Sequence, residues 1–223
     1  MALESQGIII RRNSSAAGTT AALSTDTISF DSTQGRIDRQ AGFGDFSVGM
    51  RVEIESSLNS GVWTISATAG TYIGVYEPLT AQSSGGDVSL TGYAMQEIGQ
   101  IVSFNGPQLS ANFIDITNLK STAKEKMIAL QDAGNMDVSV LFNPNASDVD
   151  LHDALIRDLR ARTQRRFDIK FTDAAGSTAQ PSAVYFAGYV ANANISGAVD
   201  DVLKGDISVA ITSRIDWIDK VSS

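Results

Sequence analysis

The sequence predicts a mainly β fold with one or two flanking helices, and three observations lead to that prediction. The 223-residue chain has 19 glycines and four prolines, and 43% of its residues are hydrophobic. Short runs rich in Val, Ile, Thr and aromatic residues recur along it, separated by Gly, Asn and Ser, as is typical of strands joined by turns. Only two segments carry apolar residues at helical spacing. We expect an all-β architecture in which one strand-rich segment forms a small unit of its own.

The N-terminal region begins with one short strand followed by a polar segment. We expect Gly7 to Arg12 to form the strand. Residues 13–27 are small and polar with no apolar period, so they are interpreted as a linker or extended arm.

Residues 28–91 are expected to form a small barrel of their own. Six apolar runs lie close together here and are broken by turns such as Asn59-Ser60-Gly61. The predicted strands are 28–30, 36–39, 50–54, 61–67, 71–76 and 87–90. We therefore place an inserted domain at residues 27–92, within a larger module formed by residues 1–26 and 93–223.

The rest of the larger module is expected to supply a sheet and the first of two helices. A helix over about 122–132 is indicated by Thr122 and Glu125, which have capping-box spacing, and by Ala123, Met127 and Leu130, which share one helical face. Strands are predicted at about 97–105, 110–117, 137–142, 167–172, 184–191 and 202–213.

A second helix is predicted over about 149–163. Leu151, Leu155 and Leu159 lie four residues apart, so they share a face that can pack on a sheet. Acids lie near its start and arginines gather toward its end, as the helix dipole favours. His152, the one histidine of the chain, is interpreted as a solvated residue at the helix start.

The composition argues against catalytic and metal chemistry. Without Cys and with a single His, the chain lacks thiolate nucleophiles, Cys-ligated zinc and most acid–base triads. Asp148, Asp150 and Asp153 are interpreted as helix-capping acids, because the Gly and distal Glu of a calcium loop are missing. Ser121 and Lys124 match a Ser-x-x-Lys pattern without its companion motifs. We predict no catalytic residue, no metal site and no cofactor.

Charge and hydropathy narrow the possible partners. The net charge of −8 argues against general nucleic-acid binding, which depends on Lys and Arg. Glu53 and Glu55 alternate with apolar residues on a predicted strand and are expected to face solvent. No stretch approaches the 18 apolar residues that a membrane helix needs, and Gly7 to Arg12 does not resemble a signal peptide.

An ordered set of short segments gives the strongest functional indication. The segments are Met1 to Gly7, Gln96 to Phe104, Asn105-Gly106-Pro107, Asp115-Ile116-Thr117, Asp132-Ala133-Gly134, Phe142-Asn143-Pro144, Phe171-Thr172-Asp173, Phe186-Ala187-Gly188-Tyr189 and Asp201 to Gly205. In this order they resemble the major tail tube proteins of lambda-like siphoviruses, which are long-tailed, non-contractile bacteriophages, and the resemblance covers residues 1 to about 25 and 93 to 223.

Residues 28–91 carry a second, separate pattern. It consists of Phe46, Val48-Gly49, Asn59-Ser60-Gly61 and Trp63-Thr64-Ile65, and it resembles β-rich insertions in other phage tail proteins.

The resemblance implies a structural virion protein that is made in the host bacterial cytoplasm and is not an enzyme. It implies a two-sheet β-sandwich or barrel with a flanking helix, into which residues 27–92 are inserted. It also implies stacked hexameric rings that form the tail tube, with a sheet of each subunit joining a β-barrel around a lumen through which DNA passes. The implied partners are further copies of the chain and the tail terminator, tape measure and tail-tip proteins, with no membrane involved. The alternative is another β-rich virion or injection-system component, such as a tail terminator, a contractile-system tube protein or an adhesive module.

Two groups of residues are candidates for these contacts. An acidic wall would let DNA pass without sticking, and Glu97 and Asp206 are our candidates for acids that face the lumen. An arginine-rich surface could meet acids of a neighbouring subunit. The candidates for inter-subunit contacts are Arg11, Arg12, Arg157, Arg160, Arg165 and Arg166.

Overall fold

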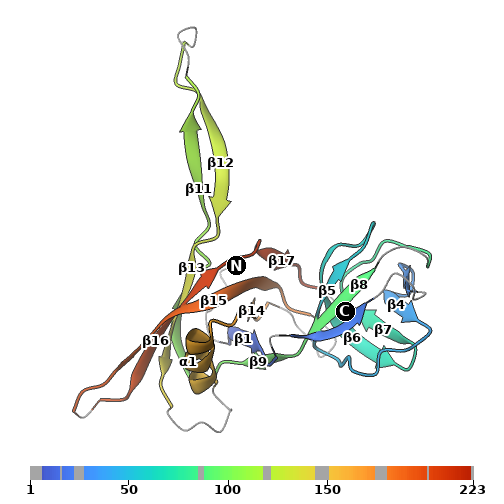
Figure 1. The fold of residues 1–223 in the computed structure, drawn as a ribbon, viewed down its shortest axis with the longest axis horizontal. Helices are drawn as coiled ribbons and strands as arrows, with labels where there is room; N and C mark the ends of the chain where they lie inside the picture. The colour runs from blue at the N-terminus through green and yellow to red at the C-terminus, as the bar shows by residue number, and fades with distance from the viewer. Residues whose placement is uncertain are drawn as a thin grey trace. The chain divides into compact units, whose positions relative to one another are not determined.

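The protein is mainly β, as the sequence predicts, and it divides into two compact units. The structure is a computed structural model that describes residues 7–15, 17–22, 28–84, 88–117, 122–143, 151–173, 180–199 and 201–221. Unit 1 comprises Met1–Ile98, Arg165–Phe186 and Asp216–Ser223, and unit 2 comprises Gly99–Gln164 and Ala187–Ile215. Within the described ranges there is a single helix, and the strands form antiparallel pairs (Figure 1).

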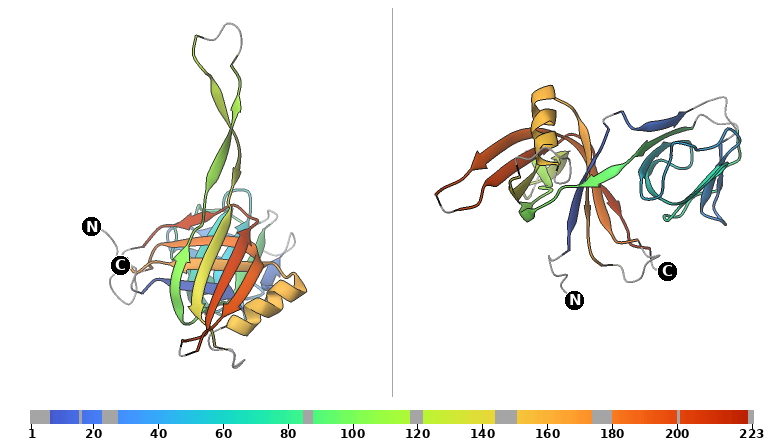
Figure 2. Two further views of the ribbon diagram at one scale, coloured as in Figure 1. Left: turned by 90° about the vertical axis from the view of Figure 1, so that its left-hand side faces the viewer. Right: turned by 90° about the horizontal axis from the view of Figure 1, so that it is seen from below.

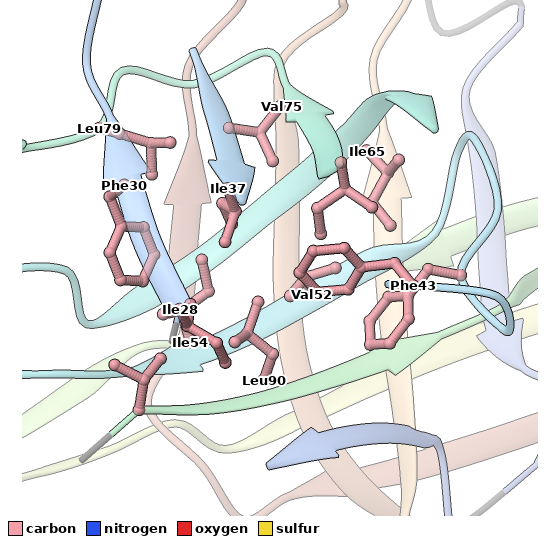
Figure 3. Close-up of a cluster of buried hydrophobic side chains, with 13 residues drawn as sticks. Ile28, Phe30, Ile37, Phe43, Val52, Ile54, Ile65, Val75, Leu79 and Leu90 are labelled. Atoms are coloured by element: carbon pink, nitrogen blue, oxygen red, sulfur yellow. The ribbon is translucent and has the colours of Figure 1, made fainter. Parts of the chain in front are cut away.

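Seven strands of unit 1 form a sheet that curls around an apolar core, in the order β2-β8-β5-β6-β7-β4-β3. Alternating residues of these strands turn Ile28, Phe30, Val52 and Ile54 into the core, where aromatic rings such as Phe43 fill the centre (Figure 3). The strands are β2 (Thr19–Ala22), β3 (Ile28–Asp31), β4 (Arg36–Arg39), β5 (Arg51–Glu55), β6 (Gly61–Ala69), β7 (Tyr72–Val75) and β8 (Ser89–Tyr93).

The six strands predicted in this region are confirmed, and β2 is an additional one. Interpreting residues 13–27 as a linker was wrong at Thr19–Ala22, which pairs with β8. The small side chains of β2 give no apolar pattern, so its backbone pairing was invisible in the sequence.

The remaining strands of unit 1 pair in the order β9-β1-β14-β15, and β17 also pairs with β15. Ile10 of β1 is fully buried and lies opposite Ile169 of β14. The predicted strands at 7–12 and 167–172 are confirmed, whereas β17 was not predicted. The bounds are β1 (Ile9–Asn13), β9 (Met95–Glu97), β14 (Arg165–Lys170), β15 (Ala183–Ser196) and β17 (Asp216–Ile218).

Unit 2 contains a four-stranded antiparallel sheet in the order β10-β13-β16-β15, to which β15 contributes its residues from Ala187 onward. A two-stranded hairpin, β11–β12, leaves this sheet between β10 and β13, and the helix α1 lies beside the sheet (Figure 2). The bounds are β10 (Ile101–Asn105), β11 (Ser110–Asp115), β12 (Lys126–Asp132), β13 (Asn135–Leu141), α1 (His152–Ala161) and β16 (Lys204–Ile211).

The strand predicted over 97–105 is two strands. The N–H of Ile98 donates to the carbonyl of Ile10, which ends β9 in unit 1. Gln100 then has a φ of 56°, in the left-handed region, and the chain turns into β10. Apolar residues on both sides of Gly99-Gln100, such as Ile98 and Ile101, concealed this break in the sequence.

The helix predicted over 122–132 was wrong, because Lys126–Asp132 forms β12. Eleven residues make a marginal helix, and weak helical signals are readily overridden by tertiary pairing. Here Met127 and Ile128 lie opposite Ile114 and Phe113 of β11, so pairing with β11 satisfies the backbone hydrogen bonds that a helix would form internally.

The second predicted helix is confirmed as the shorter α1, but the interpretation of His152 was wrong. His152 is 2% exposed. Its Nδ1 accepts the N–H of Asn143 at 3.1 Å, and its Nε2 lies 2.9 Å from the carbonyl oxygen of Gly99. Its ring stacks on Phe142. The histidine therefore ties α1 to the start of β10 and to the end of β13.

Candidate assembly and conduit surfaces

The four-stranded sheet of unit 2 has one apolar and one polar side. In β13 the residues Met136, Val138 and Val140 are buried, and the residues that alternate with them are polar up to Ser139. β16 shows the same alternation. We call the solvent-exposed side the polar face, and its central residues are Ser103, Asn105, Asp137, Ser139, Asn192, Asn194, Asp206 and Ser208.

The charges at the centre of the polar face are negative. Asp137 lies opposite Ser208, and Asp206 lies between Ser139 and Asn194 in the register of the sheet. The Ser139 hydroxyl donates to Asp206 Oδ1 at 2.6 Å. Small hydroxyl and amide side chains therefore surround the two carboxylates at the centre of the face, and Lys204 lies on the same side at the end of β16.

The two acids that the sequence proposed for a lumen lie in different units. Asp206 is exposed on the polar face of unit 2. Glu97 is exposed in β9 of unit 1, opposite Arg11 in the register. That either side chain faces a lumen remains a prediction.

The β11–β12 hairpin of unit 2, which we call the arm, exposes apolar side chains on both faces. Phe113 lies opposite Ile128, and Ile114 lies opposite Met127. Because successive residues of a strand point to opposite sides, the first pair occupies one face and the second pair occupies the other. Phe113 and Ile128 are each 61% exposed. Apolar side chains exposed on both faces are typical of surfaces that interact with another protein, so the arm is a candidate assembly surface.

The backbone is tightly packed where the arm leaves the sheet. Gly106 has a φ of 110°, and a Cβ atom there would lie 2.6 Å from the carbonyl oxygen of Asn135. Gly134 has a φ of 62°, and its Cβ atom would lie 2.5 Å from the carbonyl oxygen of Gln108. Only glycine fits both conformations at these distances, so the base of the arm has a defined geometry.

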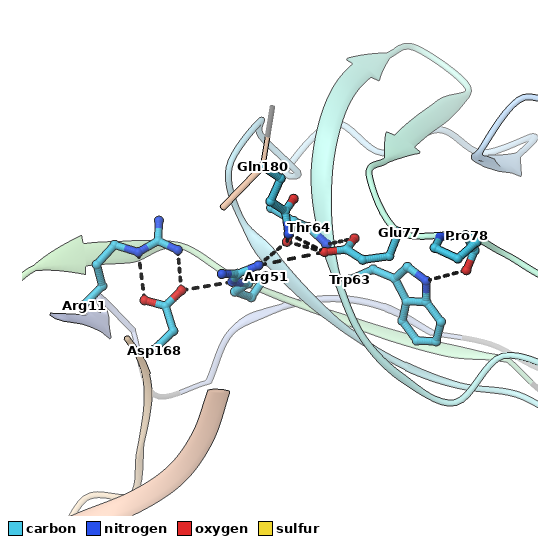
Figure 4. Close-up of polar contacts among 8 residues, drawn as sticks. All are labelled: Arg11, Arg51, Trp63, Thr64, Glu77, Pro78, Asp168 and Gln180. Atoms are coloured by element: carbon cyan, nitrogen blue, oxygen red, sulfur yellow. Dashed lines mark hydrogen bonds and ion pairs between the residues drawn. The ribbon is translucent and has the colours of Figure 1, made fainter. Parts of the chain in front are cut away.

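A buried ionic cluster lies in unit 1 (Figure 4). Asp168 is fully buried and accepts hydrogen bonds from Arg11 Nε at 2.8 Å and from Arg51 Nε at 3.0 Å. Arg51 is also fully buried and donates to the hydroxyl of Thr64. Glu77 accepts hydrogen bonds from the backbone N–H and the hydroxyl of Thr64 at 2.7 and 2.8 Å. The cluster joins β1 and β14 to the curled sheet.

A second ionic cluster in unit 1 is centred on Glu53. Its carboxylate accepts two hydrogen bonds from Arg166, at 3.0 and 3.2 Å, and one from the Tyr185 hydroxyl at 2.9 Å. The Arg166 guanidinium lies over the Tyr93 ring, 4.7 Å from its centre. Burial, followed by the charge of Glu53, raises the pKa of Tyr185. The expectation that Glu53 faces solvent was wrong, whereas Glu55 is exposed as predicted.

The six candidate arginines occupy different environments. Arg157 and Arg160 are exposed on α1, where Arg157 pairs with Asp153 at 3.3 Å. α1 ends at Ala161, and Arg165 and Arg166, which follow the predicted helix, belong to β14. Arg12 is 3% exposed. Contact of these six residues with a neighbouring subunit remains a prediction.

Some of the residues interpreted from the sequence lie in segments outside the described ranges. Asp148, Asp150 and Ser121 lie in such segments. Among the residues that the structure describes, no cluster of His, Cys, Asp and Glu could hold a metal ion. In the same part of the chain, no helix is long and apolar enough to span a membrane.

Sequence reasoning missed Asp137 and the buried cluster around Asp168. The alternation of polar and apolar residues over 135–141 could have indicated Asp137. Nothing local distinguishes Arg51 or Asp168 from exposed charges, because their burial depends on strands that are distant in sequence.

The comparison with protein families identifies the chain's family. A family model described as phage tail tube, TTP, lambda-like matches residues 67–221, more than half of the chain. The chain belongs to the lambda-like phage tail tube protein family. No curated protein matches the sequence.

Membership in the tail tube family confirms several predictions. The family is structural and non-enzymatic, and the tail tube protein is part of the virion tail. Family membership implies assembly with other tail proteins. The matched range begins within β6 and includes the whole of unit 2, with its polar face and its arm.

Proposed function

We propose that this tail tube protein assembles into stacked hexameric rings whose lumen is lined by the polar face of unit 2. The observation that carries the proposal is the combination, in one sheet, of a polar face with an acidic centre and an apolar arm at one end. Six copies per ring is the number that the resemblance to lambda-like tube proteins implies. DNA passes through the lumen without specific contacts.

The edge strand β10 supports ring formation. Within the described part of the chain, β13 is the one strand that pairs with β10, so the outer edge of β10 has unpaired backbone groups. Val102 in this strand is exposed. An open edge is an aggregation hazard unless another strand covers it, and closing a ring of sheets into a barrel removes such edges. The edge of β10 therefore pairs with a neighbouring copy in the ring.

The charge of the polar face suits a conduit for DNA. A ring repeats Asp137 and Asp206 in every copy, which makes a continuous negative band whose field decays over about 8–10 Å at physiological salt. Phosphates are repelled by such a wall and do not adhere to it. Free subunits should show no measurable duplex binding at about 0.15 M salt.

Residues 27–92 are proposed to lie on the exterior of the tube, because an insertion of this size would obstruct the lumen. Replacing residues 28–91 by a short Gly-Ser linker removes Arg51 and Glu53, but Asp168 keeps its pair with Arg11, and the freed sides of Asp168 and Arg166 are expected to meet water. The shortened chain is therefore expected to assemble. Failure of a folded, shortened chain to form tubes would show that the insertion belongs to a ring contact.

A single-cysteine experiment tests the lumen assignment, because the chain has no native Cys. Ser208→Cys places a thiol on the polar face, and Leu58→Cys places one at an exposed position of unit 1 as the matched control. In tubes verified by negative-stain microscopy, Ser208→Cys should react with a small maleimide but not with a large polyethylene-glycol maleimide, whereas Leu58→Cys should react with both. Equal reaction of Ser208→Cys with both reagents would place the polar face outside.

For the proteins at the two ends of the tail, we propose only the class of protein that binds there. The terminator at one end and the tail-tip proteins at the other would contact the terminal rings, and the tape measure protein would occupy the lumen before DNA does. Purified tubes mixed with each candidate should bind the terminator and tip proteins only at their ends, as seen by electron microscopy. Binding along the sides of the tube would contradict this arrangement.

A further inference from the structure

A second apolar surface of unit 2 lies at the turn between β15 and β16. Four large aliphatic residues are exposed there, and Val199 reaches 93% exposure. We call them the tip cluster. Asp201 pairs with Lys204 at 3.2 Å beside them, so these two charges neutralise each other. The tip cluster consists of Ile195, Val199, Val202 and Leu203.

The register of the sheet places the tip cluster and the arm at opposite ends of the same strands. Asn135, where β13 follows the arm, lies opposite Ala210 near the end of β16. Leu141, at the other end of β13, lies opposite Lys204, which follows the tip cluster. Two views of the ribbon show the arm and the β15–β16 turn extending in different directions from this sheet (Figures 1 and 2).

We propose that the tip cluster of one copy is the docking surface for the arm of the next copy in the stack. This inference rests on the proposed function. Repetition along an axis requires two unlike surfaces at opposite ends of the subunit, because a head-to-tail contact is heterologous and does not close. The arm and the tip cluster are both apolar and exposed, and they lie at opposite ends of the sheet. Contact between them would remove both apolar surfaces from water.

The length of the arm fits this contact. At about 3.3 Å per residue, the six residues of β11 span about 20 Å and the seven residues of β13 span about 23 Å. The arm thus extends beyond its own sheet by almost the length of that sheet. It can reach the tip end of a copy stacked on it, where its apolar faces would contact the aliphatic side chains of the turn.

Crosslinking tests which surface receives the arm. Subunits with Ile114→Cys and size-tagged subunits with Val202→Cys are mixed, assembled and treated with a short bismaleimide. Mixed tubes should give the heterodimeric adduct, and either variant alone should give none. The matched control replaces Val202→Cys by Asn194→Cys on the polar face and should give no adduct. An Ile114→Cys homodimer, or an adduct with Asn194→Cys in place of Val202→Cys, would overturn the proposal.

A double-mutant cycle gives an independent readout. Val202→Asp and Phe113→Ser alter exposed side chains, so the free subunits should fold as the wild type does, by circular dichroism. Each is expected to raise the concentration needed for tube formation by about tenfold or more, since each removes apolar burial at the contact. Residues that share a contact have non-additive effects, so the double variant should be less impaired than the product of the two. Strictly multiplicative effects would overturn the proposal, whereas wild-type protein that forms no tubes would refute the proposed function instead.

Discussion

The curled sheet of unit 1 and the arm of unit 2 are both built from short antiparallel strands, yet they bury their side chains differently. The curled sheet turns Ile37, Ile65 and Leu90 into its own core, where all three are fully buried. The arm exposes Phe113 and Ile128 although they lie opposite each other. Two strands alone cannot enclose an apolar layer, because a hairpin has two open faces. The first region is therefore complete within one subunit, whereas the second is, on our proposal, completed by assembly.

The two units also differ in how far their charged groups are buried. In unit 1 the carboxylate of Asp168 is held by Arg11 and Arg51 and is fully removed from water. On the polar face of unit 2, Asp206 accepts a hydrogen bond from Ser139 and stays exposed. Buried charges stabilise one arrangement of strands, whereas exposed carboxylates shape the potential that a passing polyanion meets. Mutations in the first region should change stability, and those in the second should change assembly or transport.

The largest expected effect is on the stability of unit 1. Asp168→Ala removes the carboxylate between two guanidinium groups and leaves the fully buried Arg51 with only the more distant Glu77, at 4.0 Å, as an ion-pair partner, so it should cost about 3–5 kcal/mol. Trp63 and Trp217 both belong to unit 1, so their fluorescence during urea denaturation reports on it. The control Asp38→Ala removes the partly exposed pair with Arg36 and should cost less than about 1 kcal/mol. Equal losses for the two variants would show that burial of the cluster does not matter.

The next effect separates stability from assembly. Phe113→Ser combined with Ile128→Ser should leave the melting temperature of the free subunit almost unchanged, because both side chains are exposed. If a partner covers them, about 1.5–3 kcal/mol is lost per side chain at each contact, and the concentration required for tubes rises by about a hundredfold or more. Light scattering measures that concentration. Leu58→Ser, in unit 1 and 57% exposed, is the control and should assemble as the wild type does. A fall in the melting temperature of the double variant would instead assign the pair an internal role.

A smaller effect is expected at the joint between α1 and its sheet. His152→Ala removes the acceptor of the Asn143 N–H and the partner of the Gly99 carbonyl in a buried setting, which should cost about 1–3 kcal/mol. Hydrogen exchange should become faster in α1 and at the start of β10, while exchange in the curled sheet of unit 1 is unaffected. Arg157→Ala on the exposed side of α1 is the control. Unchanged exchange in α1 would mean that the histidine does not hold the helix.

The smallest effect concerns pH. The Val202 N–H, and then Lys204, lower the pKa of Asp201 below its usual value of 3.8. A depressed pKa means that the carboxylate stabilises the β15–β16 turn at pH values above 3.8, and this contribution is lost as the pH falls through the depressed value. NMR titration should show the turn amides shifting in that acidic range, and Asp201→Asn should abolish the transition. A transition that persists in Asp201→Asn would assign it to another group.

Some of the fold could be predicted from the sequence because its determinants are local. Period-two alternation and glycine-containing turns located every strand of the curled sheet except β2, and Leu151 and Leu155 at helical spacing located α1. The arm was mispredicted in part because Thr122 and Glu125 suggested a capped helix, whereas strand pairing with β11 determined the structure of Lys126–Asp132.

The properties of the candidate surfaces also divide into those that the sequence determines locally and those that depend on tertiary structure. The sequence by itself determined the mainly β class, the absence of Cys, the net negative charge and the ordered segments that resemble tail tube proteins, because these depend on composition and on neighbouring residues. Tertiary structure alone decided that Asp168 binds Arg51, that His152 is buried and that Phe113 is exposed. Burial and pairing depend on which distant strands come together, whereas the sequence pattern of a strand indicates only which of its sides is apolar. The pattern does not indicate whether the subunit itself or another copy covers that side.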